Sequence, residues 1–179
     1  MDTQELKIPQ ERIAVLIGAH GTVKKRIEQR MHVRITVDSD EGDVTIEGED
    51  SVTVFESIAI VKAIGRGFNP EIAELLYGEA YSLDILNIPD FVGASKKHMA
   101  RMKGRIIGRE GRARTMIEDT TQTHISVYGK TIAIIGRFED VPIARQALEM
   151  LLEGAPHGNV YRWLENKKRE QIRREFEGK

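Results

Sequence analysis

Two short glycine motifs carry the clearest chemical signal in this 179-residue sequence. The first is Gly18-Ala19-His20-Gly21, and the second is Gly108-Arg109-Glu110-Gly111. Two glycines three residues apart allow a tight turn, and the backbone amides of such a turn at the start of a helix can bind a phosphate group. A single motif of this kind is weak evidence, because glycine pairs with this spacing often occur by chance. Its occurrence twice in one chain strengthens the prediction of a phosphate-binding turn.

The sequence around the motifs repeats as well. Ile17 precedes the first motif and Ile107 the second, and both copies carry an Ile-Glu pair that begins ten residues after that isoleucine. Further along, Ile35 of the first copy corresponds to Ile125 of the second. Such self-similarity indicates an internal duplication. We therefore predict two domains, residues 1–78 and residues 79–179.

The elements that position the motifs also follow the same order twice. Each copy predicts a strand, a short helix, the glycine turn, a second helix, two strands and a longer helix. The predicted elements of the first copy are 5–8, 10–17, 22–30, 33–37, 44–47 and 51–64, and those of the second copy include 83–88, 112–120, 124–128, 131–135 and 140–153. The second copy has ten more residues before its motif, so we expect an insertion or a lengthened first helix there.

Local patterns give three further predictions. Thr22 is expected to cap the helix that follows the first motif. A terminal helix is predicted from Val160 to Phe176; its thin apolar stripe favours packing on its own domain or exposure to solvent, and contact with a partner or with RNA is an open alternative. The helix at 51–64 is expected to place most of its apolar residues on the core side, namely Val54, Phe55, Ile58, Ala59 and Val61.

Composition limits the classes of protein that the chain can represent. Apolar residues make up 40% of the sequence, enough for a core in each of two small domains. The absence of cysteine excludes disulfides and thiolate metal sites and fits a reducing compartment. No apolar run approaches the roughly 20 residues of a membrane span, and the first residues are too polar for a signal peptide. We therefore expect a soluble, cytoplasmic protein.

The formal net charge of −1 conceals a segregation of charge along the chain. Eight basic residues lie between Lys96 and Arg114, with one acidic residue among them. Between Asp38 and Glu56 there are eight acidic residues and no Lys or Arg. An isolated charged run is usually a solvated helix face, but this basic run surrounds the second glycine motif. It therefore favours a surface that faces phosphate.

The order of elements, together with the GxxG motif, resembles the K-homology (KH) domain in its type I arrangement. The resemblance covers nearly the whole chain and implies an α+β fold of two tandem type I KH domains, each a three-stranded antiparallel sheet packed on three helices. It also implies that each domain clamps about four nucleotides of unpaired RNA, with phosphates on the glycine turn and bases in an apolar groove. Few aromatic residues lie nearby, so hydrogen bonds rather than ring stacking would give specificity.

The resemblance assigns RNA-binding residues in both copies. In the second domain they are Arg105, Ile107, Gly108, Arg109, Glu110, Gly111, Arg112, Arg114 and Ile125, and in the first Ile17, Gly18, Ala19, His20, Gly21, Lys24, Lys25 and Ile35. The expected groove floor consists of Ile106, Ile107, Ile117 and Ile125 in the second domain and Ile17, Ile27 and Ile35 in the first, several of them also core. We expect the second domain to be the main site, because its turn contains a guanidinium, and we expect Glu110 to face solvent or pair with an arginine.

The two copies, the GREG loop within RIIGREGRARTMIED and the insertion before it resemble the small-subunit ribosome-assembly KH proteins of archaea and eukaryotes. That resemblance implies binding to pre-rRNA near its 3′ end, and it implies two partners, the rRNA-processing endonuclease that trims this end and an rRNA dimethyltransferase. The first KH domain of eukaryotic relatives lacks a good GxxG, whereas this chain keeps Gly18 and Gly21. The first domain can therefore bind RNA or protein. The short N-terminal segment favours an archaeal member.

Other classes fit less well. The five histidines are scattered without HExxH spacing, and neither a GxSxG nor a Walker motif is present, so we expect no metal, no cofactor and no catalysis. Glu118 and Asp119 are helix neighbours and point in different directions, so they make no carboxylate pair. The alternatives are a protein–protein scaffold that uses the acidic face of the first domain, and another KH RNA-binding subunit such as an exosome component. Single-stranded DNA is a further possible ligand.

Overall fold

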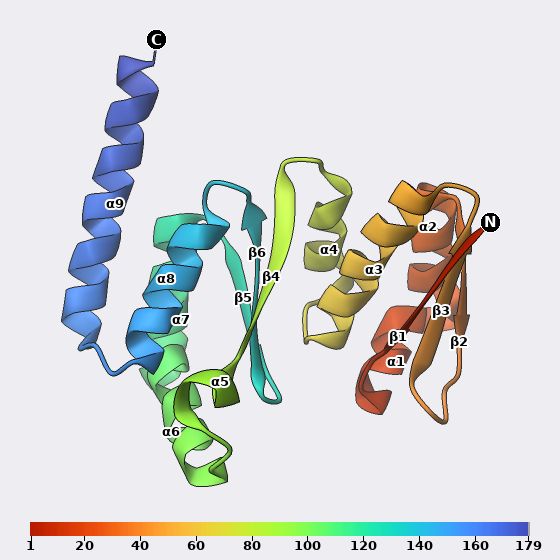
Figure 1. The fold of residues 1–179 in the computed structure, drawn as a ribbon, viewed down its shortest axis with the longest axis horizontal. Helices are drawn as coiled ribbons and strands as arrows, with labels where there is room; N and C mark the ends of the chain where they lie inside the picture. The colour runs from red at the N-terminus through yellow and green to blue at the C-terminus, as the bar shows by residue number, and fades with distance from the viewer. Residues whose placement is uncertain (179) are drawn as a thin grey trace. The chain divides into compact units, whose positions relative to one another are not determined.

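The chain divides into two units, one spanning Met1–Tyr81 and one beginning at Ser82, in a computed structural model that describes residues 1–178. Each unit has its own sheet and its own helices (Figure 1). No helix in the described part of the chain is both long and apolar enough to cross a membrane.

The first unit is a three-stranded sheet in the order β1-β3-β2, with both neighbouring pairs antiparallel. The helices cover one face of this sheet (Figure 1). Its elements are β1 (Asp2–Lys7), α1 (Gln10–Ile17), η1 (Ala19–Gly21), α2 (Thr22–Met31), β2 (Val33–Val37), β3 (Asp43–Gly48), α3 (Ser51–Gly65), α4 (Pro70–Ala73) and η2 (Glu74–Tyr77).

Alternation along the strands explains how this unit closes around a core. Val33 and Ile35 of β2 are buried, whereas Arg34 and Thr36 between them are exposed. Ile35 pairs with Ile46 of β3, which is also buried, so the apolar side chains of neighbouring strands share one face. That face packs against the buried sides of the helices.

The second unit repeats the arrangement with a sheet in the order β4-β6-β5. Strands β5 and β6 are antiparallel and are joined by a tight turn at Gly129-Lys130. Its elements are β4 (Tyr81–Asn87), α5 (Ile88–Val92), α6 (Lys96–Ile107), η3 (Arg109–Gly111), α7 (Arg112–Thr121), β5 (His124–Tyr128), β6 (Thr131–Arg137), α8 (Val141–Leu152) and α9 (His157–Glu177).

The predicted order of elements is confirmed in both copies, and the α+β fold is that of two tandem type I KH domains. The ten additional residues of the second copy form the extra helix α5 and also lengthen the helix before the glycine motif. That helix, α6, has 12 residues, whereas α1 has eight. Both forms of the predicted extension therefore occur.

Two local predictions about the first unit are wrong. Phe55 is 74% exposed, because α3 packs on the sheet through Val54, Ser57 and Val61, and residue 55 lies about 100° around the helix from Val54. Ile58 and Ala59 are only half-buried. Thr22 does not cap α2, because the capping position is Gly21 and no side chain bonds to the helix start there. By contrast, Asp50 caps α3 by accepting a hydrogen bond from the Val52 amide.

The terminal helix α9 packs on its own domain along its first turns. Val160 and Leu164 are buried against α7 and α8. Further along, the Gln171 side-chain amide donates to Asp140 at 3.3 Å, and burial raises the pKa of that carboxyl. Ile172 and Phe176 are exposed, and the last turns of α9 extend past the other helices of the domain (Figure 1).

Candidate nucleic-acid interface

The two glycine motifs form the same turn. Gly18 and Gly108 have φ/ψ of 74°/172° and 74°/175°, and each accepts a hydrogen bond from the glycine three residues later. Those second glycines, Gly21 and Gly111, have φ near 75° and lie directly before α2 and α7. The backbone therefore makes an identical bend at the start of a helix in both domains, which is the geometry that presents amides to an anion.

The two glycines of each turn differ in what surrounds them. A Cβ on Gly18 would lie 2.5 Å from Cγ2 of Val23, and a Cβ on Gly108 would lie 2.7 Å from Cβ of Ala113, so both positions are closed by the following helix. A Cβ on Gly111 would meet nothing within 4 Å, and one on Gly21 would meet only Cε of Lys25, at 3.7 Å. The second glycine of each turn thus leaves an open surface for a ligand.

The second turn carries exposed positive charge. The guanidinium of Arg112 lies 3.4 Å from the Glu110 carboxylate, and both side chains are more than 70% exposed. Glu110 therefore faces solvent and pairs with an arginine, in agreement with the expectation from the sequence. Arg109 is exposed and has no ion-pair partner within 4.0 Å among residues 1–178. Its guanidinium is available to a phosphate.

Two other predicted arginines have partners inside the domain. The Arg105 guanidinium donates to the Ala155 carbonyl at 2.5 Å, and the Arg105 carbonyl lies 2.7 Å from Nε2 of His157. Arg105 thereby joins the end of α6 to the segment between α8 and α9. Nε of Arg114 lies 3.9 Å from the Glu118 carboxylate, which offsets part of its charge.

The first turn has less free positive charge. Lys24 is paired with Glu28 at 3.0 Å, and Arg26 is paired with Glu74 at 2.6 Å. The hydrogen bond from Arg26 to Glu74 raises the pKa of that guanidinium, so Arg26 is held in its charged form within the pair. Among the described residues near this turn, Lys25 is exposed and has no ion pair, whereas Ala19 and His20 add no permanent charge.

Most of the expected apolar groove floor belongs to the core instead. Ile27, Ile106 and Ile117 have no exposed surface, and Ile35 and Ile125 expose 1% and 5% of theirs. Side chains this buried cannot shelter a base, because the sheet and the helices enclose them. Ile17 and Ile107, which directly precede the turns, are half-buried and are the members of the predicted set that offer apolar surface.

One glutamate in each domain lies between the helix after the turn and the neighbouring edge strand. The Glu28 carboxylate accepts a hydrogen bond from the Ile35 amide at 2.7 Å, and the Glu118 carboxylate accepts one from the Ile125 amide at 2.8 Å. Because β2 and β5 are edge strands, these amides point away from the sheet. The sequence analysis did not assign these glutamates to the site, although the repeated Ile-Glu pair was a signal for them.

Gly104 is a second residue that the sequence analysis missed. It lies inside α6, four residues before Gly108, and a Cβ there would meet nothing within 4 Å. Glycine within a helix costs about 1 kcal/mol relative to alanine. Packing gives no reason for this cost, so Gly104 is a candidate for close approach by a ligand backbone.

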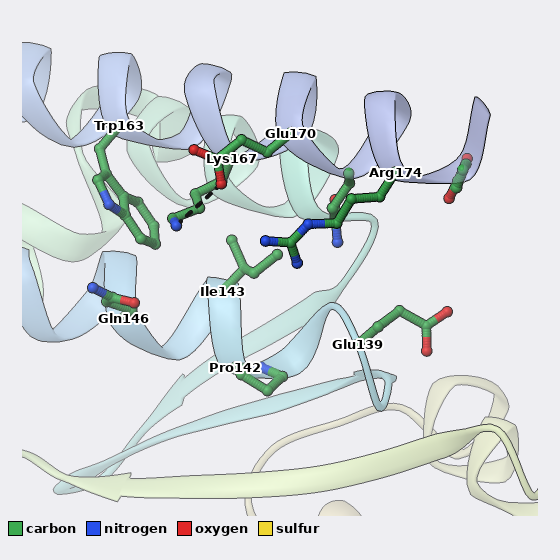
Figure 2. Close-up of a pocket in the computed structure, with 10 residues that line it drawn as sticks. Glu139, Pro142, Ile143, Gln146, Trp163, Lys167, Glu170 and Arg174 are labelled. Atoms are coloured by element: carbon green, nitrogen blue, oxygen red, sulfur yellow. Dashed lines mark hydrogen bonds and ion pairs between the residues drawn. The ribbon is translucent and has the colours of Figure 1, made fainter. Parts of the chain in front are cut away.

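Two of the hollows on the second domain differ in their relation to the glycine turn. One, of about 420 Å³, lies beside the second turn and is lined by Glu110, Arg112, Thr115, Met116 and Asp119. The other, of about 440 Å³, lies between α8 and α9 (Figure 2). In the latter, Trp163 and Lys167 of α9 lie on one side of the groove and Ile143 and Gln146 of α8 on the other, and Lys167 pairs with Glu170 at 3.3 Å. This second groove contains none of the predicted RNA-binding residues. No group of three or more potential metal ligands occurs within residues 1–178.

Comparison with known proteins agrees with this geometry. Residues 82–169 match the family model of the second KH domain of PNO1, described as a eukaryotic type KH-domain (KH-domain type I), and residues 3–64 match the KH domain model. A KH domain-containing protein of Methanocaldococcus jannaschii is 47% identical over 176 residues, which cover 96% of this chain and 77% of that protein. The chain belongs to the PNO1/Dim2 family of tandem KH-domain proteins.

Solved structures of this tandem KH family are similar over most of their length. Dim2p of Pyrococcus horikoshii is 47% identical with a TM-score of 0.86, and the match covers 93% of this chain and 99% of that one. A chain in the a/eIF2alpha–aDim2p–rRNA complex from the same organism is also 47% identical, with a TM-score of 0.88 and coverage of 94% and 95%.

Fungal members of the family are longer than this chain. The pre-rRNA-processing protein PNO1 of Coccidioides immitis is 24% identical over 167 residues, which cover 90% of this chain and 65% of that protein. The chain therefore spans less than two thirds of this relative.

Proposed function

We propose that this tandem KH protein binds single-stranded RNA of the small-subunit rRNA precursor, near its 3′ end, and acts without catalysis in the assembly and processing of the small ribosomal subunit. The observation that carries the proposal is the open turn at Gly108–Gly111, which contains Arg109, a side chain with no ion pair among residues 1–178. The names of the relatives support the choice of RNA, because one is a pre-rRNA-processing protein and another was crystallised with rRNA.

Different residues of the second domain would contact the phosphates, the faces and the edges of the RNA nucleotides. The amides at the start of α7 and the Arg109 guanidinium would hold phosphates, while Ile107 offers apolar surface to a base. Glu118 would present a carboxylate acceptor to base amino groups at the edge of β5, because only part of its hydrogen-bonding capacity is used by the Ile125 amide. The other predicted residues of the two turns, Lys24 and Lys25 included, would also contact the RNA.

Partners are part of the proposal. Family membership supports the rRNA-processing endonuclease and the rRNA dimethyltransferase as proteins that this chain would help to place on the precursor. A scaffold role is a second candidate for the first unit. Residues 1–81 contain 9 Lys and Arg against 15 Asp and Glu, a net charge of −6, whereas residues 82–179 contain 18 against 13, a net charge of +5. An acidic unit suits basic protein partners.

The double substitution Arg109→Asp with Glu110→Asp tests the RNA site. Both side chains are exposed, and aspartate tolerates the positive φ of residue 110, so the fold is expected to persist. Affinity for single-stranded RNA at fixed salt is expected to fall by at least about tenfold, because a phosphate contact is replaced by repulsion. Fluorescence anisotropy measures the affinity, and circular dichroism measures the fold.

The matched control is Lys168→Ala with Arg169→Ala on α9. It changes the net charge by the same two units at exposed residues that lack an ion pair in the described chain. The control is expected to bind RNA nearly as well as the wild type. Equal affinities for the wild type and the turn variant would refute the proposal, and so would equal losses in the two variants.

A further inference from the structure

Helix α6, which leads into the second glycine turn, is unusual in its charge. Its 12 residues, KKHMARMKGRII, contain five Lys and Arg residues and one histidine, with no acidic residue. The corresponding helix of the first unit, α1, contains Glu11 and Arg12 in eight residues. Lys97 lies in the segment by which the second copy is longer, and Arg101 stands where the first copy has Glu11, so the duplicated turn accounts for neither charge.

Lys97 and Arg101 form a stripe of positive charge along α6. Met99, Met102 and Ile106 bury one side of the helix in the domain core. Lys97 and Arg101 lie four residues apart on the other side and are exposed, and neither has an ion pair in the described part of the chain. A hollow of about 400 Å³ is lined by these two residues together with Ser95 and His98. Four residues of a helix advance by about 6 Å along its axis.

The stripe continues to the glycine turn without obstruction. Gly104 and Gly108 follow Arg101 at intervals of three and four residues, so they lie on the same face of the helix. Gly104 has no side chain, and no other atom occupies the place where its Cβ would be. Arg101 is about 10 Å from Gly108 along the helix axis, and Lys97 is about 16 Å from it. A polynucleotide backbone on the turn could therefore continue along this face.

We propose that Lys97 and Arg101 bind phosphates of RNA that continues beyond the nucleotides held by the Gly108–Gly111 turn. The proposal rests on RNA binding at that turn and adds a second contact surface, which lengthens the footprint beyond the four or so nucleotides of one KH domain. RNA is favoured over an acidic protein because the stripe ends at a phosphate-binding turn and offers no apolar anchor beside its charges. A ribose-phosphate chain repeats its charge and needs no such anchor.

The test compares random-sequence RNA pools of 4 and 12 nucleotides, each titrated into the full chain over a range of salt. A four-nucleotide footprint finds about nine positions in a 12-mer, so a gain well above ninefold for the longer pool in the wild type indicates contacts outside the turn. The variant Lys97→Ala with Arg101→Ala is expected to bind the short pool as the wild type does and to lose most of the excess gain. Its salt slope for the long pool is expected to fall by about 1.4, because each phosphate contact to a single strand contributes about 0.7.

Lys168→Ala with Arg169→Ala again serves as the matched control, since it removes two exposed charges from another helix of the same domain. The proposal is overturned if the wild type shows only the ninefold gain, if the α6 variant keeps the full gain, or if the control loses as much. A loss of binding to the short pool by the α6 variant also contradicts it, because Lys97 and Arg101 would then act within the turn site. Failure of the wild type to bind either pool would instead overturn the proposed function.

Discussion

At the scale of single residues, the two glycines of the second motif meet different physical requirements. Gly108 has φ 74° and ψ 175°, a region of backbone conformation that is nearly exclusive to glycine, and its Cα faces the first residues of α7. Gly111 has φ 74° and ψ 11°, a left-handed conformation that other residues adopt at a modest cost. The first glycine therefore serves the fold, and the second leaves space for the ligand.

This difference predicts that alanine substitutions at the two glycines have unequal effects on stability. Gly108→Ala is expected to lower the free energy of unfolding by roughly 3 kcal/mol or more, because the new Cβ would lie 2.8 Å from the Ala113 amide nitrogen in a forbidden backbone conformation. Gly111→Ala is expected to cost only about 1 kcal/mol and to weaken RNA binding, since its methyl group enters the open surface. Urea denaturation and RNA titration check both. Equal stabilities for the two variants would contradict the assignment.

The sequence predicted the two turns well, because the positions of the glycines determine which backbone conformations are allowed there. The same sequence predicted the groove floor poorly, because an isoleucine at helical spacing can face either the core or a ligand. Ile106 and Ile117 turned out to be buried, whereas Ile107 at the end of α6 is half-buried. Whether an isoleucine on a helix faces the core or the surface depends on the rotation of that helix about its axis relative to the sheet. Hydrophobic periodicity does not define that rotation closely.

At the scale of elements, the strongest patterns gave the right bounds. The predicted helix 10–17 and strands 33–37 and 124–128 agree with α1, β2 and β5. Helix α3 was found, but the apolar residues on it are too evenly spread to define its buried side. Val54 and Phe55 are neighbours with similar hydrophobicity, and the structure buries one and exposes the other.

That contrast predicts the energetics of α3. Val54→Ala is expected to destabilise the protein by about 2 kcal/mol, because a fully buried side chain leaves a cavity. Phe55→Gln is expected to change the free energy of unfolding by no more than about 0.5 kcal/mol, since the ring is mostly in solvent and glutamine favours helix. Chemical denaturation followed by circular dichroism measures both. A large loss in Phe55→Gln would mean that the ring packs against something in solution.

At the scale of the whole molecule, duplication has produced two copies of one turn in opposite electrostatic surroundings. The glycine geometry is retained in both, with φ values that agree within 1°. The charges have diverged, with a net charge of −6 in residues 1–81 and of +5 in residues 82–179. Sequence alone revealed the duplication and the charge segregation, because both are linear properties. The partners of Arg26 and Arg105, which lie 48 and 50 residues away in the sequence, depend on folding and were not predictable.

The divergence predicts that the two turns contribute unequally to RNA affinity. Ala19→Asp with His20→Asp changes the net charge of the first turn by −2, the same change that Arg109→Asp with Glu110→Asp makes in the second turn. Aspartate again tolerates the positive φ, here at residue 20. The first-turn variant is expected to lose only a fewfold in affinity, because Lys24 and Arg26 are already paired and the first unit is acidic overall, whereas the second-turn variant loses about tenfold or more. Titration of one RNA 12-mer into both variants at the same salt measures the difference. An equal or larger loss from the first turn would show that amide geometry, which the domains share, outweighs the charge around it.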